Sequence, residues 1–238
     1  MATLNTSLNT AAKENEGVNF EAPKEVRVYT YKNQNDDNKR LGGAFLQTPL
    51  FKYSNLSIIE GQNGPFLSYP SRKSNQTNDE GKPVYFDRYY PASKEAREYL
   101  NQVVLDAFNN APSYDGKISD EYYNEEDIQI TDIKITLDDS GSPINGVLGT
   151  VKVTTPLMVH PFITIRQSNT DPDDFYLAYP GYKTNDTDEN GKPVYQRYFQ
   201  TTNKAANEYL TKLVISAVEK ELNKRYVIPI SYFFLNML

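Results

Sequence analysis

The sequence predicts an α+β protein of two repeated lobes, each a small antiparallel β-meander sheet with a C-terminal α-helix. Residues 69–100 align without a gap with residues 179–210, and nearly half of the paired residues are identical. In both copies, short apolar runs separated by turn residues precede a stretch whose apolar side chains recur at helical spacing. Because a repeated unit folds as one structural piece, we expect the lobes to share a fold and to pack as an intramolecular pseudo-dimer that pairs their sheet edges.

Lobe one, residues 20–110, is expected to form a three- or four-stranded meander. A long polar turn is expected over residues 71–83, where Gly81 is the residue best able to adopt a positive φ. The expected strands begin at Val26 and continue with residues 42–50, 56–60 and 66–69.

Lobe two, residues 131–222, repeats this plan after the linker. Its long turn contains Gly191 at the position of Gly81. The expected strands cover residues 133–137, 146–154, 162–165 and 175–179.

Each lobe is expected to end in a helix that begins at a capping side chain. The expected N-cap is Ser93 in lobe one, and Thr202 or Asn203 in lobe two. The apolar side chains at helical spacing are Ala96, Leu100, Val103, Val104, Ala107 and Phe108 in the first helix, and Ala206, Leu210, Leu213, Val214, Ala217 and Val218 in the second.

Three segments lie outside the lobes. Residues 1–19 are polar and lack an apolar run, so we expect a disordered arm and no secretory signal. Acidic residues concentrate in a flexible linker, residues 111–130. The tail, residues 223–238, is apolar but shorter than the roughly 20 residues that a membrane span needs, so we expect it to dock on a lobe or on a protein partner.

Composition narrows the function classes. The absence of cysteine excludes disulfides, thiol catalysis and cysteine-based metal sites, and it fits a cytoplasmic protein. The net charge of −6 argues against a protein that coats DNA through general positive charge. Lobe one has a slight excess of cations, so a local basic surface there remains open.

The sequence holds no recognisable catalytic or metal-binding set. His160 is the only histidine and is expected to be structural, and we expect no enzyme activity, no cofactor and no metal. Asp186, Asp188 and Asn190 have the opening spacing of a calcium loop, but Arg197 occupies the position that needs a bidentate Glu. A hairpin turn therefore explains this segment better. The acidic stretch 171–174 is expected to be a solvated loop.

Residues 63–73 read N-G-P-F-L-S-Y-P-S-R-K and are followed by a polar turn with a glycine, a proline at Pro91 and a helix opening S-K-E-A-R. This order resembles the SpoVG septation-regulator family, whose members share N-G-x-F-x-x-x-P-S-[KR]-[KR]. The resemblance is weaker in lobe two, where Gly181-Tyr182 stands in place of the Ser-basic pair.

The resemblance implies a tandem SpoVG protein in which lobe two takes the place of a partner subunit. Members of the family are small bacterial regulators that dimerise and bind DNA or RNA. The arm, linker and tail have no counterpart in the short family members, which favours a phage or mobile-element version. The loss of one basic pair suggests that lobe one binds the ligand and lobe two serves as scaffold.

Cations and tyrosines interleave on the turn and first helical residues of lobe one, a combination suited to nucleic acid. The expected nucleic-acid contacts are Arg72, Lys73, Lys82, Arg88, Lys94, Arg97, Tyr69 and Tyr85. The alternative is a solvated surface with ion pairs to Asp79, Glu80, Asp87, Glu95 and Glu98. A second function also stays open, that of a protein-interaction module or inhibitor encoded by a mobile element, which the net acidity and the apolar tail favour.

Overall fold

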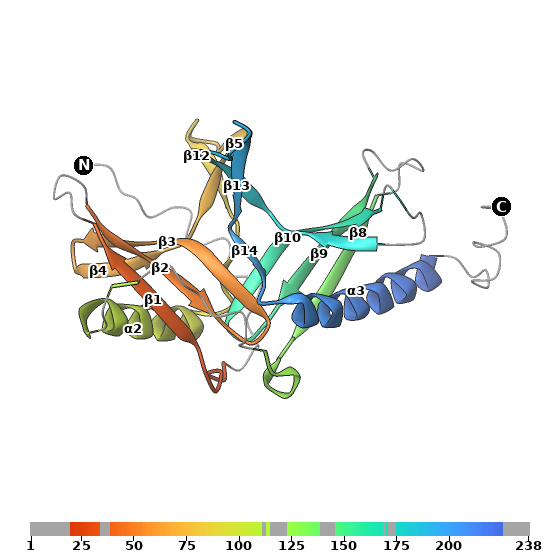
Figure 1. Ribbon diagram of the computed structural model, residues 1–238, viewed down its shortest axis with the longest axis horizontal. Coiled ribbons are helices and arrows are strands. Elements are labelled where there is room, and N and C mark those ends of the chain that lie inside the picture. The colour runs from red at the N-terminus through yellow and green to blue at the C-terminus, as the bar shows by residue number, and fades with distance from the viewer. Residues whose placement is uncertain are drawn as a thin grey trace.

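The computed structural model describes residues 20–33, 39–110, 113–114, 123–138, 146–168, 170 and 175–225. Over these residues the chain is α+β, with antiparallel sheets and two long helices, as the sequence predicts (Figure 1). The predicted arm, residues 1–19, lies outside the described residues, as does the tail after Arg225. Among the helices described, none is long and apolar enough to cross a membrane.

The first sheet forms from the N-terminal half of the chain. Helix α2, Lys94–Asn110, packs against its strands β1 and β4. Gly42 permits this approach, because a Cβ there would lie 2.8 Å from the ring of Phe108 on the helix. The strands are β1 (Arg27–Lys32), β2 (Arg40–Gln47), β3 (Phe51–Gly61) and β4 (Gly64–Ser68).

The second sheet repeats this order from the C-terminal half. Helix α3, Lys204–Arg225, packs against β8 and β11, and it continues past the lobe boundary predicted at residue 222. The strands are β8 (Asp132–Leu137), β9 (Val147–Thr154), β10 (Met158–Gln167) and β11 (Phe175–Ala178).

Each sheet is completed by a short strand from the other half of the chain. β14, Phe199–Thr201, pairs antiparallel with the start of β3, so that Phe199 lies opposite Tyr53. β7, Tyr90–Pro91, pairs with the start of β10 in the same way, so that Tyr90 lies opposite Val159. These exchanged strands cover sheet edges that would otherwise present unpaired backbone groups.

A bulge in each long strand makes room for the exchange. The register of β3 against β2 shifts between Ala44 and Leu46, and Asn55 on β3 adopts a φ of 64°. β10 has its shift against β9 between His160 and Ile163. The bulge bends each strand, so one end pairs with the exchanged strand and the other with the next strand of its own sheet.

The strands β3 and β10 begin earlier than predicted because a tight turn precedes each. The Thr48 hydroxyl accepts a hydrogen bond from the Phe51 N–H at 3.1 Å, and the Thr155 hydroxyl accepts one from the Met158 N–H at 3.0 Å. Both threonines start the sequence Thr-Pro-Leu. The apolar runs that follow were too short to show where each strand begins.

One continuous core joins the two halves. Aromatic rings from both sheets, from the exchanged strand β14 and from Tyr89, the residue before β7, meet in it, and all are almost fully buried. The rings are Phe51, Tyr53, Tyr89, His160 and Phe199.

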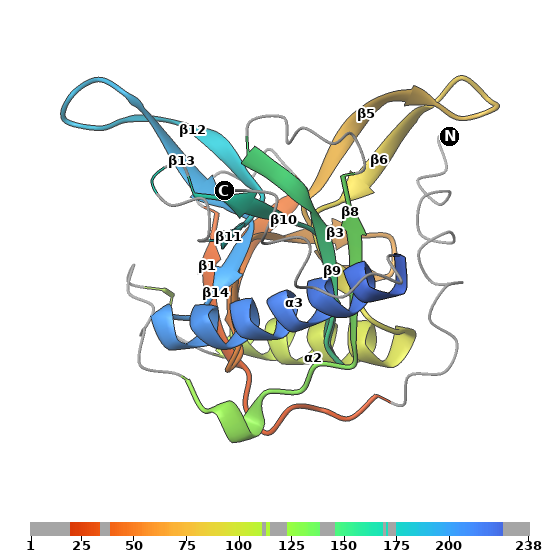
Figure 2. The same ribbon diagram turned by 90° about the vertical axis from the view of Figure 1, so that its right-hand side faces the viewer.

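The predicted polar turn over residues 71–83 is wrong as a turn, because most of it is strand. β5 (Ser71–Thr77) pairs with β6 (Pro83–Asp87), and β12 (Gly181–Thr187) pairs with β13 (Pro193–Arg197). Neither hairpin belongs to a main sheet, and the two project from the same side of the molecule and diverge (Figures 1 and 2). Polar side chains on both faces of each hairpin conceal the alternation by which half-buried strands are recognised.

The predicted caps are confirmed. The Ser93 hydroxyl accepts a hydrogen bond from the Ala96 N–H, and the Asn203 side chain accepts one from the Ala206 N–H. Asn203, not Thr202, is therefore the cap of α3.

The described parts of the predicted linker lie against the lobes. The Tyr114 N–H donates a hydrogen bond to the Thr30 carbonyl, and its ring lies 5.0 Å from that of Phe45. Asp127, at the end of a 3₁₀ turn Glu125–Asp127, forms an ion pair with Lys24.

Candidate functional site

The lobe-one hairpin pairs cations with aromatic rings across its two strands. Arg72 lies opposite Phe86, and Lys73 lies opposite Tyr85. Residues directly opposite on antiparallel strands share a face, so each face of the hairpin presents one cation beside one ring. Phe86 is 46% exposed and Tyr85 is 49% exposed, and both cations are exposed as well. A surface of this kind can stack on a base and contact a phosphate.

The tip of the hairpin is held by hydrogen bonds within the turn. The Asn78 side-chain oxygen accepts hydrogen bonds from the N–H groups of Glu80 and Lys82. Gly81 has a φ of 72°, as expected for a residue in this turn. Lys82 forms an exposed ion pair with Glu80, and the two charged atoms lie 2.6 Å apart. The alternative interpretation, a solvated surface, expected an ion pair with this acid.

At the base of the hairpin, two predicted contacts, Arg88 and Tyr69, are partly buried against other side chains. The Arg88 guanidinium lies 5.8 Å from the ring of Phe162 and 5.6 Å from that of Tyr198, both in the other half of the chain. Its Nε is buried, with no hydrogen-bond partner among the described residues. Burial also raises the pKa of Tyr69, whose ring lies edge-on against Tyr89.

The two predicted cations on α2 occupy different settings. Arg97 lies over the ring of Tyr69 at 5.3 Å, whereas Lys94 is exposed and forms an ion pair with Glu98 at 3.6 Å. Of the eight predicted contacts, the structure thus brings Arg72, Lys73, Lys82 and Tyr85 together on the hairpin. The other four lie at its base or on the helix.

The sequence analysis did not name Phe86, or any cation or ring of the lobe-two hairpin, as a candidate contact. Lys183 on β12 lies opposite Tyr195 on β13, as Lys73 lies opposite Tyr85. Tyr195 is 65% exposed. The signal was present in the sequence, because Gly-Lys-Pro-Val-Tyr occurs in both aligned hairpins, at residues 81–85 and 191–195. The strand register was needed to show which cation lies opposite which ring.

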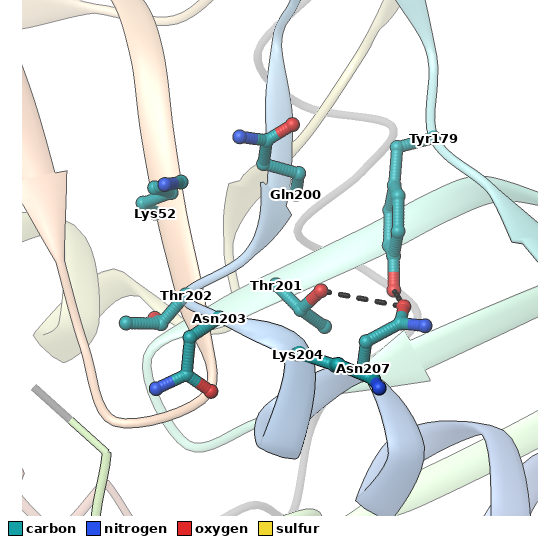
Figure 3. Close-up of a pocket in the computed structure, with 8 residues that line it drawn as sticks. All are labelled: Lys52, Tyr179, Gln200, Thr201, Thr202, Asn203, Lys204 and Asn207. Atoms are coloured by element: carbon teal, nitrogen blue, oxygen red, sulfur yellow. Dashed lines mark hydrogen bonds between the residues drawn. The ribbon is translucent and has the colours of Figure 1, made fainter. Parts of the chain in front are cut away.

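A polar pocket of about 390 Å³ lies beside the first turn of α3 (Figure 3). The Tyr179 hydroxyl and the Thr201 hydroxyl both donate hydrogen bonds to the Asn207 side-chain oxygen, at 2.9 and 3.3 Å. The residues that line the pocket carry ammonium, amide and hydroxyl groups, and none is a carboxylate: Lys52, Tyr179, Gln200, Thr201, Thr202, Asn203, Lys204 and Asn207.

Two of the residues around this pocket have different contacts in lobe one. Arg97 aligns with Asn207 and Tyr69 with Tyr179, and the Arg97 guanidinium lies over the Tyr69 ring. The aligned residues thus form a hydrogen bond in lobe two and a cation–ring contact in lobe one.

His160 has the structural surroundings that the sequence analysis expected. It is fully buried, its Nδ1–H donates to the Val153 carbonyl at 3.0 Å, and its Nε2 accepts from the Tyr53 hydroxyl at 2.9 Å. Burial lowers the pKa of His160 to about 3, against a smaller opposing effect of the Val153 carbonyl. The ring is neutral and both of its nitrogens are engaged.

The acidic segment with calcium-like spacing is a hairpin turn. The Asp188 carboxylate accepts hydrogen bonds from the N–H groups of Asn190 and Lys192, in the same way as Asn78 in lobe one. Over the described part of the chain, no group of three His, Asp or Glu side chains is placed to hold a metal. Residues 171–174 lie outside the described residues.

Three curated relatives are similar to part of this chain. The SpoVG septation protein of Clostridioides difficile is 36% identical over 62 residues, which are 26% of this chain and 61% of the relative. That of Lachnospira eligens is 33% identical over 61 residues, 26% of this chain and 62% of the relative. That of Finegoldia magna is 31% identical over 74 residues, 31% of this chain and 63% of the relative.

The chain therefore spans less than two thirds of the length of these relatives. No solved structure matches it. Residues 24–110, which contain β1 to β7, the hairpin with Arg72 and Lys73, and α2, match the sequence model of the SpoVG family. Lobe one of this protein is thus a SpoVG family domain.

Proposed function

We propose that this protein is a non-catalytic, nucleic-acid-binding regulator, in which two SpoVG-like lobes form a pseudo-dimer within one chain. The observation that carries the proposal is the pairing of Arg72 with Phe86 and of Lys73 with Tyr85 on an exposed hairpin inside the SpoVG domain. Cations supply phosphate contacts and rings supply stacking, which together suit nucleic acid better than a protein surface.

The pseudo-dimer part of the proposal is supported by the reciprocal exchange of strands. β14 completes the sheet of lobe one and β7 completes that of lobe two, each at the start of the corresponding long strand. An arrangement in which each half supplies the same element to the other is typical of two subunits related by a two-fold axis. Here both halves belong to one chain.

Lobe one is expected to make the stronger ligand contact. It has Arg72 at the hairpin position where lobe two has Tyr182, and its charge balance is more positive. An anionic ligand should therefore prefer the side of lobe one. Arg88 and Tyr69 are expected to act by holding the base of the hairpin, since both are packed there.

The test is a gel-shift and anisotropy titration of the full chain with mixed-sequence DNA and RNA at about 50 mM salt, where phosphate contacts are strongest. The double change Arg72→Glu with Lys73→Glu should abolish retention and leave the thermal melting profile unchanged. The matched control, Lys212→Glu with Lys220→Glu on exposed positions of α3, changes net charge equally and should retain binding.

Loss of binding in both double variants would mean that net charge, and not the hairpin, governs retention. If the wild-type protein retains neither DNA nor RNA under these conditions, the nucleic-acid function is wrong. The protein-interaction function would then become the one to test.

A further inference from the structure

The hairpin of lobe two presents the same cation and ring as that of lobe one. Lys183 lies opposite Tyr195, and Lys73 lies opposite Tyr85. All four side chains are exposed, and Tyr195 is the most exposed large ring among the described residues, at 65%. A tyrosine this exposed contributes little to the core, and the same ring recurs opposite the same cation on both hairpins.

The two hairpins also share their turn geometry. Asn78 and Asp188 receive the same pair of backbone hydrogen bonds, and Gly81 and Gly191 have φ angles of 72° and 73°. Both hairpins have their register shift in the same place, after Lys73 and after Lys183. Each lysine–tyrosine pair therefore sits at the same distance from the tip of its hairpin.

The neighbouring cross-strand pair differs between the hairpins. Lobe one has Arg72 opposite Phe86, whereas lobe two has Tyr182 opposite Gln196. The Tyr182 hydroxyl donates a hydrogen bond to the Gln196 side chain at 2.7 Å, and its ring packs on Tyr198 at 4.8 Å. Of the pairs that set a cation beside a ring, only the lysine–tyrosine pair is thus common to both.

The ligand class follows from the chemistry of this pair. An exposed ring stacks on the flat face of a base, and an adjacent ammonium contacts the phosphate that follows it. In a duplex the base faces are covered by their neighbours and only the edges are open in the grooves. Both hairpins project from the same side of the molecule, so one flexible strand can reach them together (Figure 2).

We propose that both hairpins bind one single-stranded nucleic acid, with Tyr85 and Tyr195 each stacking on an unpaired base and Lys73 and Lys183 each contacting a phosphate. The inference rests on the proposed nucleic-acid function and extends it in two ways. It assigns a second contact to lobe two, and it selects single strands over duplex.

The experiment measures anisotropy of labelled oligonucleotides with the full chain. Single strands of about 6 nucleotides, a length suited to one binding face, are compared with single strands and duplexes of about 30 nucleotides. Tyr85→Ala and Tyr195→Ala should each weaken binding of the long single strand by about 5-fold to 150-fold. Tyr85→Phe and Tyr195→Phe keep the ring and should bind within about 2-fold of the wild-type protein.

Length dependence separates two bound hairpins from one. A strand that engages both gains affinity from the effective concentration of the second contact, and this gain should vanish in either alanine variant. In the double variant Tyr85→Ala with Tyr195→Ala, the long strand still offers more positions at which the protein can bind than the short strand does. The difference in affinity that remains in this variant measures only that effect. Melting temperatures of all variants should match the wild-type protein, since both rings are exposed.

Binding that depends on Tyr85 but not on Tyr195 would overturn the second contact and leave the proposed function intact. Duplex bound as tightly as single strand, with no effect of either tyrosine, would overturn the single-strand inference. Failure of every oligonucleotide to bind would contradict the proposed function itself, so the two failures are distinguishable.

Discussion

The two lobes contact each other through side chains that differ between them. Tyr53 contacts His160, and each stands at the same spacing after its Thr-Pro-Leu turn. Arg88 lies against Tyr198, and these residues align in the repeat. In a dimer of identical subunits, residues near a two-fold axis meet their own copies, so Arg88 would lie beside a second arginine. Two non-identical lobes can instead place a cation beside a ring and a donor beside an acceptor.

The Tyr53–His160 pair shows what this difference permits. Because the Nδ1–H of His160 donates to the Val153 carbonyl, its Nε2 is an acceptor, and the Tyr53 hydroxyl is the donor that satisfies it. Both side chains are almost fully buried. The non-identical pair therefore satisfies every polar atom that it buries, as a buried pair must.

The largest expected effect is the loss of this pair. His160→Leu leaves the buried Tyr53 hydroxyl without its acceptor and should lower the free energy of unfolding by about 3 kcal/mol. Adding Tyr53→Phe removes the orphaned hydroxyl and should recover about 1 kcal/mol or more. Urea unfolding of the wild-type, single and double variants measures both values. Strictly additive single effects would show that the two side chains do not interact.

Acid should weaken the contact between the lobes through the same histidine. The pKa of His160 is about 3 in the folded protein, below its ordinary value of 6.5. Between these two pH values the histidine is protonated in the unfolded chain but neutral in the folded protein, so acid favours unfolding. Stability from this group is fully present above about pH 6.5 and falls as the pH drops toward 3. Between pH 7 and about pH 4.5 the loss should be about 2–3 kcal/mol.

The control for the pH effect is His160→Leu, which cannot titrate at this position. Its free energy of unfolding should start lower but decline less steeply over the same pH range. Parallel pH profiles of the variant and the wild-type protein would assign the acid sensitivity to other groups. Equilibrium unfolding in urea at several pH values provides the comparison.

The elements set by local residues could be predicted from the sequence. Both helices, their caps Ser93 and Asn203 and the strands near Val28 and Ile135 follow from spacing and capping chemistry. Gly81, expected at positive φ, is found there because a turn requires it.

The features set by pairing between distant residues could not be predicted. Tyr53 and His160 are 107 positions apart, and only the strand exchange brings them into contact. Arg88 had the charge expected of a ligand contact, but its rings come from the other half of the chain. The repeated Thr-Pro-Leu sequences were the signal that could have placed these strand starts.

The smallest expected effect tests the difference between the Tyr179–Asn207 hydrogen bond of lobe two and the Arg97–Tyr69 contact of lobe one. Asn207→Ala removes the acceptor of the Tyr179 hydroxyl, which is largely buried, and should cost about 1–2 kcal/mol. Arg97→Ala removes a cation over the Tyr69 ring and should cost about 0.5–1 kcal/mol, since the Tyr69 hydroxyl has no hydrogen-bond partner among the described residues to lose. Asn207→Asp keeps the acceptor oxygen and should recover most of the loss. Thermal and urea unfolding rank the three variants. A greater cost for Arg97→Ala would show that the cation–ring contact stabilises its lobe more than the tyrosine hydrogen bond stabilises the other.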